Sequence, residues 1–321
     1  MIQKYVLAID LGGTKIRVAL VSQNGRILSS IRQSSNAGKG KKHVIENMES
    51  IIKLLLKKSN KDIHDIKSIS MAIAGINDIK RGIVTTAPNL PGWHGVNIRS
   101  MAQEKFGLTA YLINDATAAA LGEHRLGAGV GYKNLVYLTV STGIGGGLVI
   151  DNKLYSGEDG AAGELGHMKV LANGPRCNCG KEGCLEALSS GSAMTRKAID
   201  AINNGRNSIL LKLCDNDINK VTAEMIAAAA RKGDDLSSEI ISEASYYLGI
   251  GLSNLINIFN PDVIVIGGGL SKMGAMYLGP AKKTAKQIAF RLPAARVKIV
   301  KSKLGDNAGL IGAALYAFGQ K

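Results

Sequence analysis

Aromatic residues are scarce in this chain, where they make up 4% of 321 residues and include a single tryptophan. Proteins that bind single-stranded nucleic acids stack bases on aromatic side chains, so this scarcity argues against such a role. Lys and Arg outnumber Asp and Glu by 40 to 25, but they are scattered apart from a group at Lys39, Lys41 and Lys42. We therefore expect a solvated basic surface without a nucleic-acid partner, although the net charge of +15 suits small polyanions such as nucleotides or polyphosphate.

Long apolar runs are also missing. The N-terminal segment reaches Asp10 before a useful apolar run has formed, which argues against a signal peptide and against a membrane anchor. The longest uncharged stretch, 135–150, is too short to span a bilayer and is rich in Gly, Thr and Ser, so we expect a strand, a turn and a second strand there. These features predict a cytoplasmic protein that has no membrane partner.

Cysteine is rare, and three of the four cysteines lie within eight residues, at Cys177, Cys179 and Cys184. In a reducing compartment such a cluster indicates a metal site rather than a disulfide framework. Together with His167 it offers three thiolates and one imidazole, the ligand set of a tetrahedral structural zinc site. Cys214 lies outside the cluster, and we expect it to be a small buried residue.

Two carboxylates, Glu164 and Glu186, flank this ligand set without completing it. Carboxylates held beside a structural metal are free to bind something else, and neutral polar groups such as sugar hydroxyls suit them. The alternative is a loop that zinc stabilises and that has no further role. The spacing is not that of a common zinc finger, so the motif alone leaves the function open.

Two segments, 5–22 and 134–150, share one design of strand, glycine-rich turn and strand, which predicts two similar α/β halves. No linker or low-complexity segment separates them. We place a small domain at 1–113 with 307–321, and a large domain with the zinc loop at 114–306. Expected helices cover 43–58, 189–203, 222–232, 234–259, 281–290 and 307–318. Further strands are expected at 68–76, at 297–300 and directly before the glycines at 267–269.

The glycine-rich turns have the composition of phosphate-binding loops, because glycine lets backbone N–H groups approach an anion closely. Asp10 is placed to hold a magnesium ion through water, since magnesium gives up its water reluctantly. The first turn would bind phosphate with Gly12, Gly13, Thr14 and Lys15, and the second with Thr142, Gly143 and Gly145. Gly268 and Gly269 either give an adenine flat access or only form a tight turn.

Asn114 and Asp115 stand where a strand ends and a helix begins. Asp115 is either the N-cap of that helix or a general base that accepts a proton from an attacking hydroxyl, as phosphoryl transfer requires. The local pattern does not decide between these two interpretations.

These motifs, taken in order, resemble the ROK family of sugar kinases and related repressors over almost the whole chain. They are DLGGTK at 10–15, APNLPGW at 87–93, INDATAAALGE at 113–123, STGIGGG at 141–147, GELGH at 163–167, CNCGKEGCLE at 177–186 and GLSNLINIFNPDVIVIGGG at 251–269. The resemblance implies an actin-like (ribonuclease H-like) two-domain fold, with the sugar and ATP in the cleft between the domains.

The resemblance also implies roles for individual residues. Asp115 matches the catalytic base of the family, and Gly75 matches a backbone position near the sugar. The positions that match sugar ligands are Asn89, Asn114, Asp115, Glu164, His167 and Glu186. His167 would bind zinc through one ring nitrogen and the sugar through the other. Thr117 departs from the Asn that many relatives carry, and we interpret it as variation on a helix surface.

Within the family the cysteine pattern is most similar to that of bacterial glucokinases. The prediction is therefore ATP- and magnesium-dependent phosphorylation of the 6-hydroxyl of glucose to glucose 6-phosphate, in a homodimer or dimer of dimers. Alternatives are a kinase for N-acetylglucosamine, N-acetylmannosamine or mannose, a broad-specificity hexokinase, or polyphosphate as the donor. A non-catalytic sugar sensor is disfavoured because the repressors carry a DNA-binding domain ahead of the first strand, where Asp10 leaves no room. An actin- or chaperone-like ATPase would not need GELGH beside a cysteine cluster.

Overall fold

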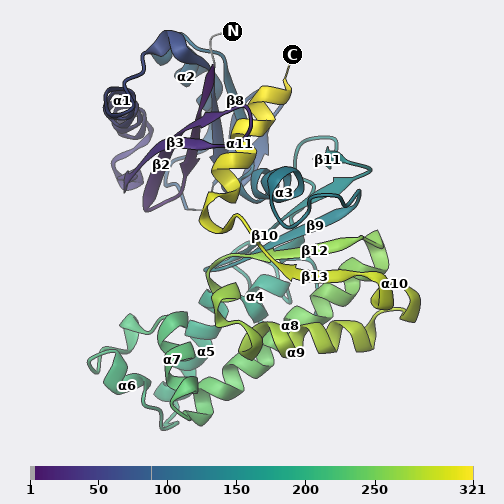
Figure 1. The fold of residues 1–321 in the computed structure, drawn as a ribbon. Coiled ribbons are helices and arrows are strands. Elements are labelled where there is room, and N and C mark those ends of the chain that lie inside the picture. Colours follow the sequence, from purple (N-terminus) through teal and green to yellow (C-terminus); the bar gives the residue numbers. More distant parts are fainter. Residues whose placement is uncertain (1–3, 88, 321) are drawn as a thin grey trace. The chain divides into compact units, whose positions relative to one another are not determined.

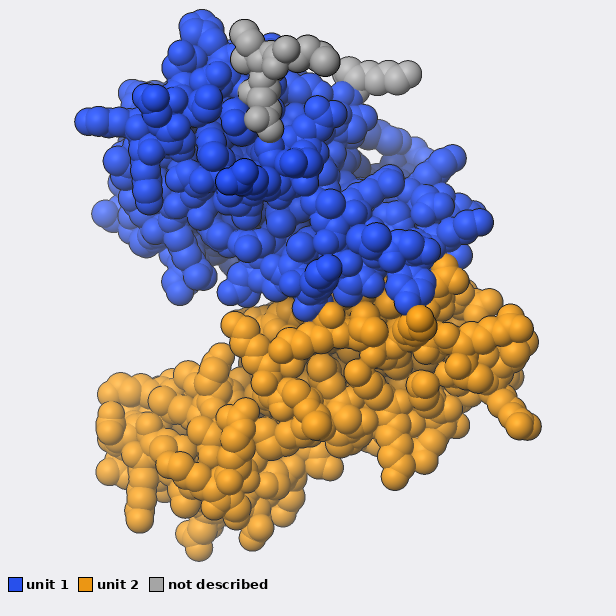
Figure 2. Space-filling model, viewed as in Figure 1, with its two compact units in different colours: residues 1–137, 147–163, 302–321 blue, residues 138–146, 164–301 orange. Residues whose placement is uncertain are grey.

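The computed structural model describes residues 4–87 and 89–320. By their internal contacts the residues form two compact units, shown in different colours in Figure 2. Unit 1 comprises 1–137, 147–163 and 302–321, and unit 2 comprises 138–146 and 164–301. The domain boundaries expected from the sequence, 1–113 with 307–321 and 114–306, stay a prediction.

Unit 1 is built on a five-stranded sheet with the order β3-β2-β1-β4-β8 (Figure 1). The strands are β1 (Tyr5–Leu11), β2 (Lys15–Ser22), β3 (Ile27–Ser34), β4 (Ile66–Ile73) and β8 (Ala110–Ile113). The first three are antiparallel, whereas β4 runs parallel to β1 and β8 runs parallel to β4. Side chains alternate along β1, so Leu7 and Ile9 enter one core cluster while Val6 and Ala8 enter another.

Helices cover both faces of this sheet. They are α1 (Lys41–Lys58), α2 (Ile98–Phe106), α3 (Asp115–Leu126) and α11 (Ala308–Gly319), with 3-10 helices at Ala37–Lys39, Ile63–Asp65 and Gly305–Asn307. The buried face of α1, from Val44 to Leu55, packs in the cluster of Leu7, and α3 and α11 pack in the cluster of Ala8. Unit 1 also contains a small sheet of β5 (Ile76–Asp78), β6 (Ile83–Thr86) and β7 (His94–Asn97).

The second five-stranded sheet has the order β11-β10-β9-β12-β13. Its strands are β9 (Leu135–Val140), β10 (Ile144–Ile150), β11 (Lys153–Tyr155), β12 (Val263–Gly267) and β13 (Lys298–Lys301). Position by position, this order repeats that of the first sheet, and β11 is antiparallel to β10 while β13 is parallel to β12. The two similar halves predicted from the glycine-rich hairpins are therefore confirmed.

Unit 2 adds a helical layer (Figure 1). The helices are α4 (Leu185–Ser189), α5 (Gly191–Asn203), α6 (Leu210–Leu213), α7 (Ala223–Arg231), α8 (Asp235–Phe259), α9 (Ala275–Ile288) and α10 (Arg291–Arg296), with 3-10 helices at Leu165–His167, Ile218–Lys220 and Gly269–Met273. Asp234 is the N-cap of the long helix α8, and its side chain accepts the N–H of Ser237. The C-cap is Asn260, in the left-handed conformation. Among the described residues, no helix is long and apolar enough to cross a membrane.

Two expected elements differ from the observed ones by more than two residues at one end. The strand expected at 68–76 ends at Ile73, because Gly75 has a φ of 115° that leaves the extended conformation. The helix expected at 281–290 runs from Ala275 to Ile288 and holds Pro280 within it. The expected start at residue 281 lies directly after Pro280, and proline lacks the backbone N–H that a helix interior uses.

Candidate active site

Asp115 is the first residue of α3, and Asn114 alone separates it from the strand β8. The interpretation of Asp115 as the N-cap is wrong, because Asn114 caps the helix. The Oδ1 atom of Asn114 accepts the backbone N–H groups of Ala116 and Thr117, both at 3.0 Å. The Asp115 carboxylate is thus not needed as the cap, and it lies at the positive end of the helix dipole.

Burial raises the pKa of Asp115, although backbone N–H groups of Ala116 and of Asp115 itself partly offset this rise. The pKa of Asp10, in β1, is raised to about 6, first by burial and then by the negative charge of Asp115, while Arg17 and Arg32 lower it. A carboxylate with a raised pKa is a stronger base near neutral pH. Unit 1 therefore carries two electrostatically coupled carboxyl groups, one of them at a helix N-terminus.

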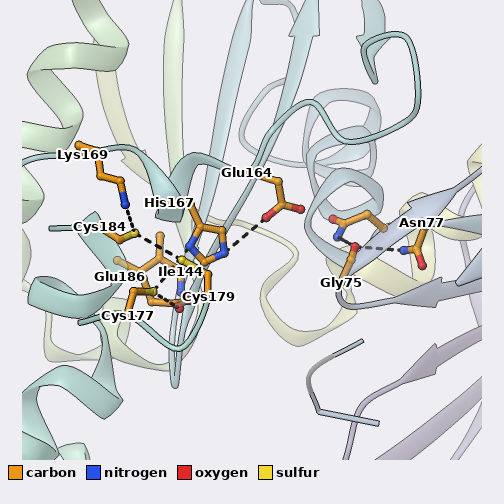
Figure 3. Close-up of polar contacts among 11 residues, drawn as sticks. Gly75, Asn77, Ile144, Glu164, His167, Lys169, Cys177, Cys179, Cys184 and Glu186 are labelled. Carbon is orange, nitrogen blue, oxygen red and sulfur yellow. Dashed lines mark hydrogen bonds and ion pairs between the residues drawn. The ribbon is translucent and has the colours of Figure 1, made fainter. Parts of the chain in front are cut away.

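The carbonyl of Gly75 is held by two amide side chains. Nδ2 of Asn114 donates to it at 3.2 Å. Nδ2 of Asn77 donates to it at 3.3 Å (Figure 3). Gly75 itself cannot be replaced easily, because a Cβ there would come within 2.9 Å of the Cα of Ala87. Sequence analysis did not identify Asn77, whose only signal is a polar residue in an apolar segment, and Asn77 is 1% exposed.

The first glycine-rich turn joins β1 to β2 and packs against the loop of Asn89. A Cβ on Gly13 would lie 3.1 Å from the Cβ of Asn89, and the Ser35 hydroxyl donates to the Gly13 carbonyl at 2.8 Å. Thr14, Lys15 and Asn89 are exposed. Unit 1 thus brings together two of the predicted motifs, although Pro88 of APNLPGW lies outside the described residues.

Thr117 is buried at 4% exposure, so its assignment to a helix surface is wrong. The reason is the close approach of β10 to α3. A Cβ on Gly147 would come within 2.9 Å of the Thr117 Cα and 2.7 Å of the Ala120 Cβ. The glycine therefore lets the strand lie directly against the helix that begins at Asp115.

In unit 2 the predicted metal ligands gather in space (Figure 3). One ligand atom from each of His167, Cys177, Cys179 and Cys184 lies within 4.8 Å of all the others. The Cys179 and Cys184 Sγ atoms are 3.7 Å apart, as are the Cys177 Sγ and the His167 Nδ1. Ligands at zinc–sulfur distances of about 2.3 Å in a tetrahedron would be about 3.8 Å apart, so these residues fit zinc.

Charged side chains surround this cluster. The Nε2 atom of His167 faces Oε2 of Glu164 at 3.8 Å, and the Lys169 ammonium donates to the Cys184 Sγ at 2.9 Å. Three thiolates around a divalent cation would leave one negative charge, which Lys169 can offset. Sequence analysis did not identify Lys169, because a single exposed lysine carries no motif. Cys214 is buried outside the cluster, as predicted.

Glu186, in α4, joins the cysteine cluster to the second glycine-rich turn. Its Oε2 accepts the backbone N–H of Ile144 at 2.8 Å, and its Oε1 lies 3.5 Å from the Cys177 Sγ. Glu186 is partly buried, whereas Glu164 is exposed. The two carboxylates that flank the cysteines therefore have different surroundings.

A pocket of about 500 Å³ lies in unit 2. It is lined by Ser141, Thr142, Gly191, Ser192, Thr195, Arg196, Ile199, Val221, Thr222, Ala223, Glu224, Gly269 and Leu270. Thr142 and Gly269 were predicted nucleotide ligands, whereas Gly143, Gly145 and Gly268 are not part of the lining. Sequence analysis missed the residues from α5 and α7 because these helices carry no motif. The pocket combines apolar and hydrogen-bonding groups, as small-molecule sites do.

Comparison with known proteins identifies the family. The model of the ROK family matches residues 6–319. The chain belongs to the ROK family. It is similar to the glucokinase of Thermotoga maritima, with 36% identity over 96% of each chain. It is also similar to the xylose repressor of Caldicellulosiruptor bescii, with 33% identity over 96% of this chain and 76% of the repressor.

Comparison with solved structures shows that this protein has the fold of other ROK family proteins. A ROK family glucokinase from Streptomyces griseus, in complex with glucose and AMPPNP, matches with a TM-score of 0.84 and 32% identity. The match covers 97% of this chain and 98% of that one. The family and the actin-like α/β fold predicted from the motifs are therefore confirmed.

Proposed function

We propose that this ROK protein is an ATP-dependent hexokinase that phosphorylates the 6-hydroxyl of glucose to give glucose 6-phosphate. The observation that carries the proposal is the placement of Asp115, a carboxylate with a raised pKa at the start of α3, relieved of the capping role by Asn114. Further support comes from the similarity to the glucokinase of Thermotoga maritima and to a glucokinase bound to glucose and AMPPNP.

Asp115 accepts the proton of the sugar hydroxyl as the hydroxyl attacks the terminal phosphate. ATP supplies the phosphoryl group, and ADP leaves as the bond to the terminal phosphate breaks. Asp10 would hold a magnesium ion through water, and that ion would supply positive charge beside the phosphates. The backbone N–H groups of the turns around Gly12 and Gly143 hold the phosphates. The pocket beside Thr142 takes the nucleoside. All of these groups act by position and charge, and none forms a covalent bond to the phosphate.

The hexose ligands in this proposal are mainly amides and carboxylates, which pair well with sugar hydroxyls. They are Asn89, Asn114, Asp115, Glu164, His167 and Glu186, with the backbone at Gly75. In unit 1, Asn114 can serve the sugar through its second amide hydrogen, because the first is donated to Gly75. In unit 2, zinc bound through the His167 Nδ1 would leave its Nε2, on the side of Glu164, for a sugar hydroxyl.

The metal bound by the cysteine cluster in this proposal is structural zinc, since three thiolates and an imidazole close a tetrahedral site. The reduced cysteines favour a cytoplasmic location, and we expect a homodimer or a dimer of dimers. Glucose is the leading substrate, with mannose, N-acetylglucosamine and N-acetylmannosamine as rivals, and polyphosphate as a rival donor.

The first experiment is a kinase assay over a panel of hexoses with ATP and with polyphosphate. We expect the highest kcat/KM for glucose with ATP. A higher value for another sugar would change the substrate, and the absence of phosphorylation of all of them would refute the kinase assignment.

The second experiment tests the base. Asp115→Asn should lower kcat by about 10²- to 10⁴-fold, the usual contribution of a general base, and should change hexose affinity much less. Hexose binding can be followed through the fluorescence of Trp93, the single tryptophan. Asp235→Asn is the matched control, because Asp235 is likewise the first residue of a helix that another residue caps. Near-normal turnover of Asp115→Asn would remove Asp115 from the mechanism.

A further inference from the structure

The turn between β9 and β10 is held in place from two directions within unit 2. On one side, the backbone N–H groups of Gly191 and Ser192, at the start of α5, donate to the carbonyls of Ser141 at 2.7 Å and Thr142 at 3.1 Å. On the other side, Ile144 donates its N–H to the Glu186 carboxylate at 2.8 Å. The first set of contacts joins main chain to main chain, so the second depends on the identity of a side chain.

Close packing surrounds the hydrogen bond between Ile144 and Glu186. A Cβ on Gly143 would lie 2.5 Å from the Glu186 Oε2, so the carboxylate lies directly against the turn. A Cβ on Gly166 would lie 2.9 Å from the Ile144 carbonyl carbon. Ile144 is therefore enclosed between Gly166 and Glu186, and it is 4% exposed.

Both residues that enclose Ile144 are close neighbours of metal ligands. Gly166 directly precedes His167, and Glu186 follows Cys184 by two residues. The Glu186 Oε1 also lies 3.5 Å from the Cys177 Sγ. A metal that fixes these ligands therefore fixes both walls around Ile144.

We propose that Glu186 is a positioning residue for the 141–144 turn, through which the cysteine cluster sets the affinity for the nucleotide. The inference rests on the proposed function, because it takes the pocket beside Thr142 as the nucleotide site. It gives Glu186 a second task beside hexose binding. It also gives the metal an effect on the donor as well as on the sugar.

Loss of the carboxylate leaves the Ile144 N–H without its acceptor, whereas glutamine keeps an acceptor oxygen of the same reach. A hydrogen bond to a charged acceptor in a protein is strong enough to change an equilibrium by about 10- to 100-fold. Without sugar, Glu186→Ala should therefore bind nucleotide about 10- to 100-fold more weakly than wild type. Glu186→Gln should recover most of this loss.

The experiment measures the affinity for magnesium AMPPNP by calorimetry in the absence of any sugar, together with the KM for glucose. Glu164→Gln is the matched control, a second carboxylate beside the cluster that is proposed to bind hexose. It should raise the glucose KM and leave the nucleotide affinity of the sugar-free protein unchanged. Hydrogen exchange of segment 141–147 provides a readout without any ligand, and it should be faster in Glu186→Ala.

A metal arm tests the other half of the proposal. Removal of zinc by a chelator should weaken nucleotide binding by the sugar-free protein about tenfold, and added zinc should restore it. Unchanged nucleotide affinity and unchanged exchange in Glu186→Ala would overturn the positioning role, even if the glucose KM rises. Unchanged affinity of the metal-free protein would overturn the coupling to the cluster. The proposed function fails separately, if the wild type neither binds AMPPNP nor phosphorylates a hexose.

Discussion

The contact between α3 and α11 offers a direct test of how Asp115 is positioned. Gly312 in α11 lies against α3, and a Cβ there would come within 2.5 Å of the Ala118 carbonyl carbon and 3.0 Å of the Gly122 nitrogen. Carbon atoms in contact need about 3.5–4.0 Å, and the Ala118 carbonyl oxygen would lie closer still to the added Cβ. Gly312→Ala would therefore force the helices apart by about 1 Å or more. Such overpacking costs about 1–3 kcal/mol of stability. A misplacement of about 1 Å can lower turnover by about 100-fold.

The assay combines urea unfolding with steady-state kinetics. Gly312→Ala should lower the free energy of unfolding and lower kcat, with a smaller effect on the KM for ATP, because the pocket residues belong to unit 2. Gly319→Ala is the control in the same helix, since a Cβ there meets nothing within 4 Å. It should leave both quantities unchanged, or raise stability by up to about 1 kcal/mol. Wild-type stability and turnover in Gly312→Ala would refute the packing argument.

Four further predictions follow from the structure. As the proposed base, Asp115 must be ionised to accept a proton, and its pKa is raised. The kcat/KM should therefore fall on acidification at a pH above the ordinary aspartate pKa of about 3.9. An acid limb at or below that pH would contradict the assignment of Asp115 as the base. The pKa of Asp10 is raised from 3.8 in the unfolded chain to about 6 in the folded protein. At a pH above both pKa values, the ionised Asp10 therefore lowers the free energy of unfolding by roughly 3 kcal/mol. The free energy of unfolding should therefore rise as the pH falls through about 6, and Asp10→Asn should abolish that part of the rise. Metal analysis should show that Cys179→Ser has lost zinc, and its glucose KM should rise. The control Cys214→Ser should keep its zinc. Full activity of a zinc-free protein would refute a role for the metal. Glu123→Gln should destabilise unit 1 by about 2–3 kcal/mol in urea, because the buried carboxylate accepts the Ser302 hydroxyl at 2.6 Å and the N–H groups of Leu304 and Ala128 at 2.8 and 2.7 Å.

Much of the fold could be predicted because its signals are local. The helical spacing of apolar residues gave α1, α8 and α11 to within two residues, and the two glycine-rich hairpins gave the internal repeat. The start of α9 was misplaced for a local reason too. Proline usually ends or kinks a helix, whereas Pro280 lies within α9. The strand expected to reach residue 76 stopped early, because the conformation of Gly75 is not visible in its identity.

The candidate site was predicted unevenly for a related reason. The candidate metal ligands could be found from composition, because three cysteines and a histidine within eighteen residues are typical of a metal site. Asn77, Lys169 and the pocket residues on α5 and α7 carry no such chemistry in their spacing. Their roles depend on the residues that they contact once the chain has folded.

The sequence by itself determined the chemistry that is available, which is a carboxylate at a helix start, two glycine-rich turns and a set of candidate metal ligands. Spacing along the chain is enough for these, because each is built from neighbours. Only the tertiary structure decided which of these residues contact one another and which are buried. It assigned the cap of α3 to Asn114, buried Thr117, and brought Glu186 to the N–H of Ile144, 42 residues away. Such contacts depend on the packing of strands and helices, and no short pattern encodes them.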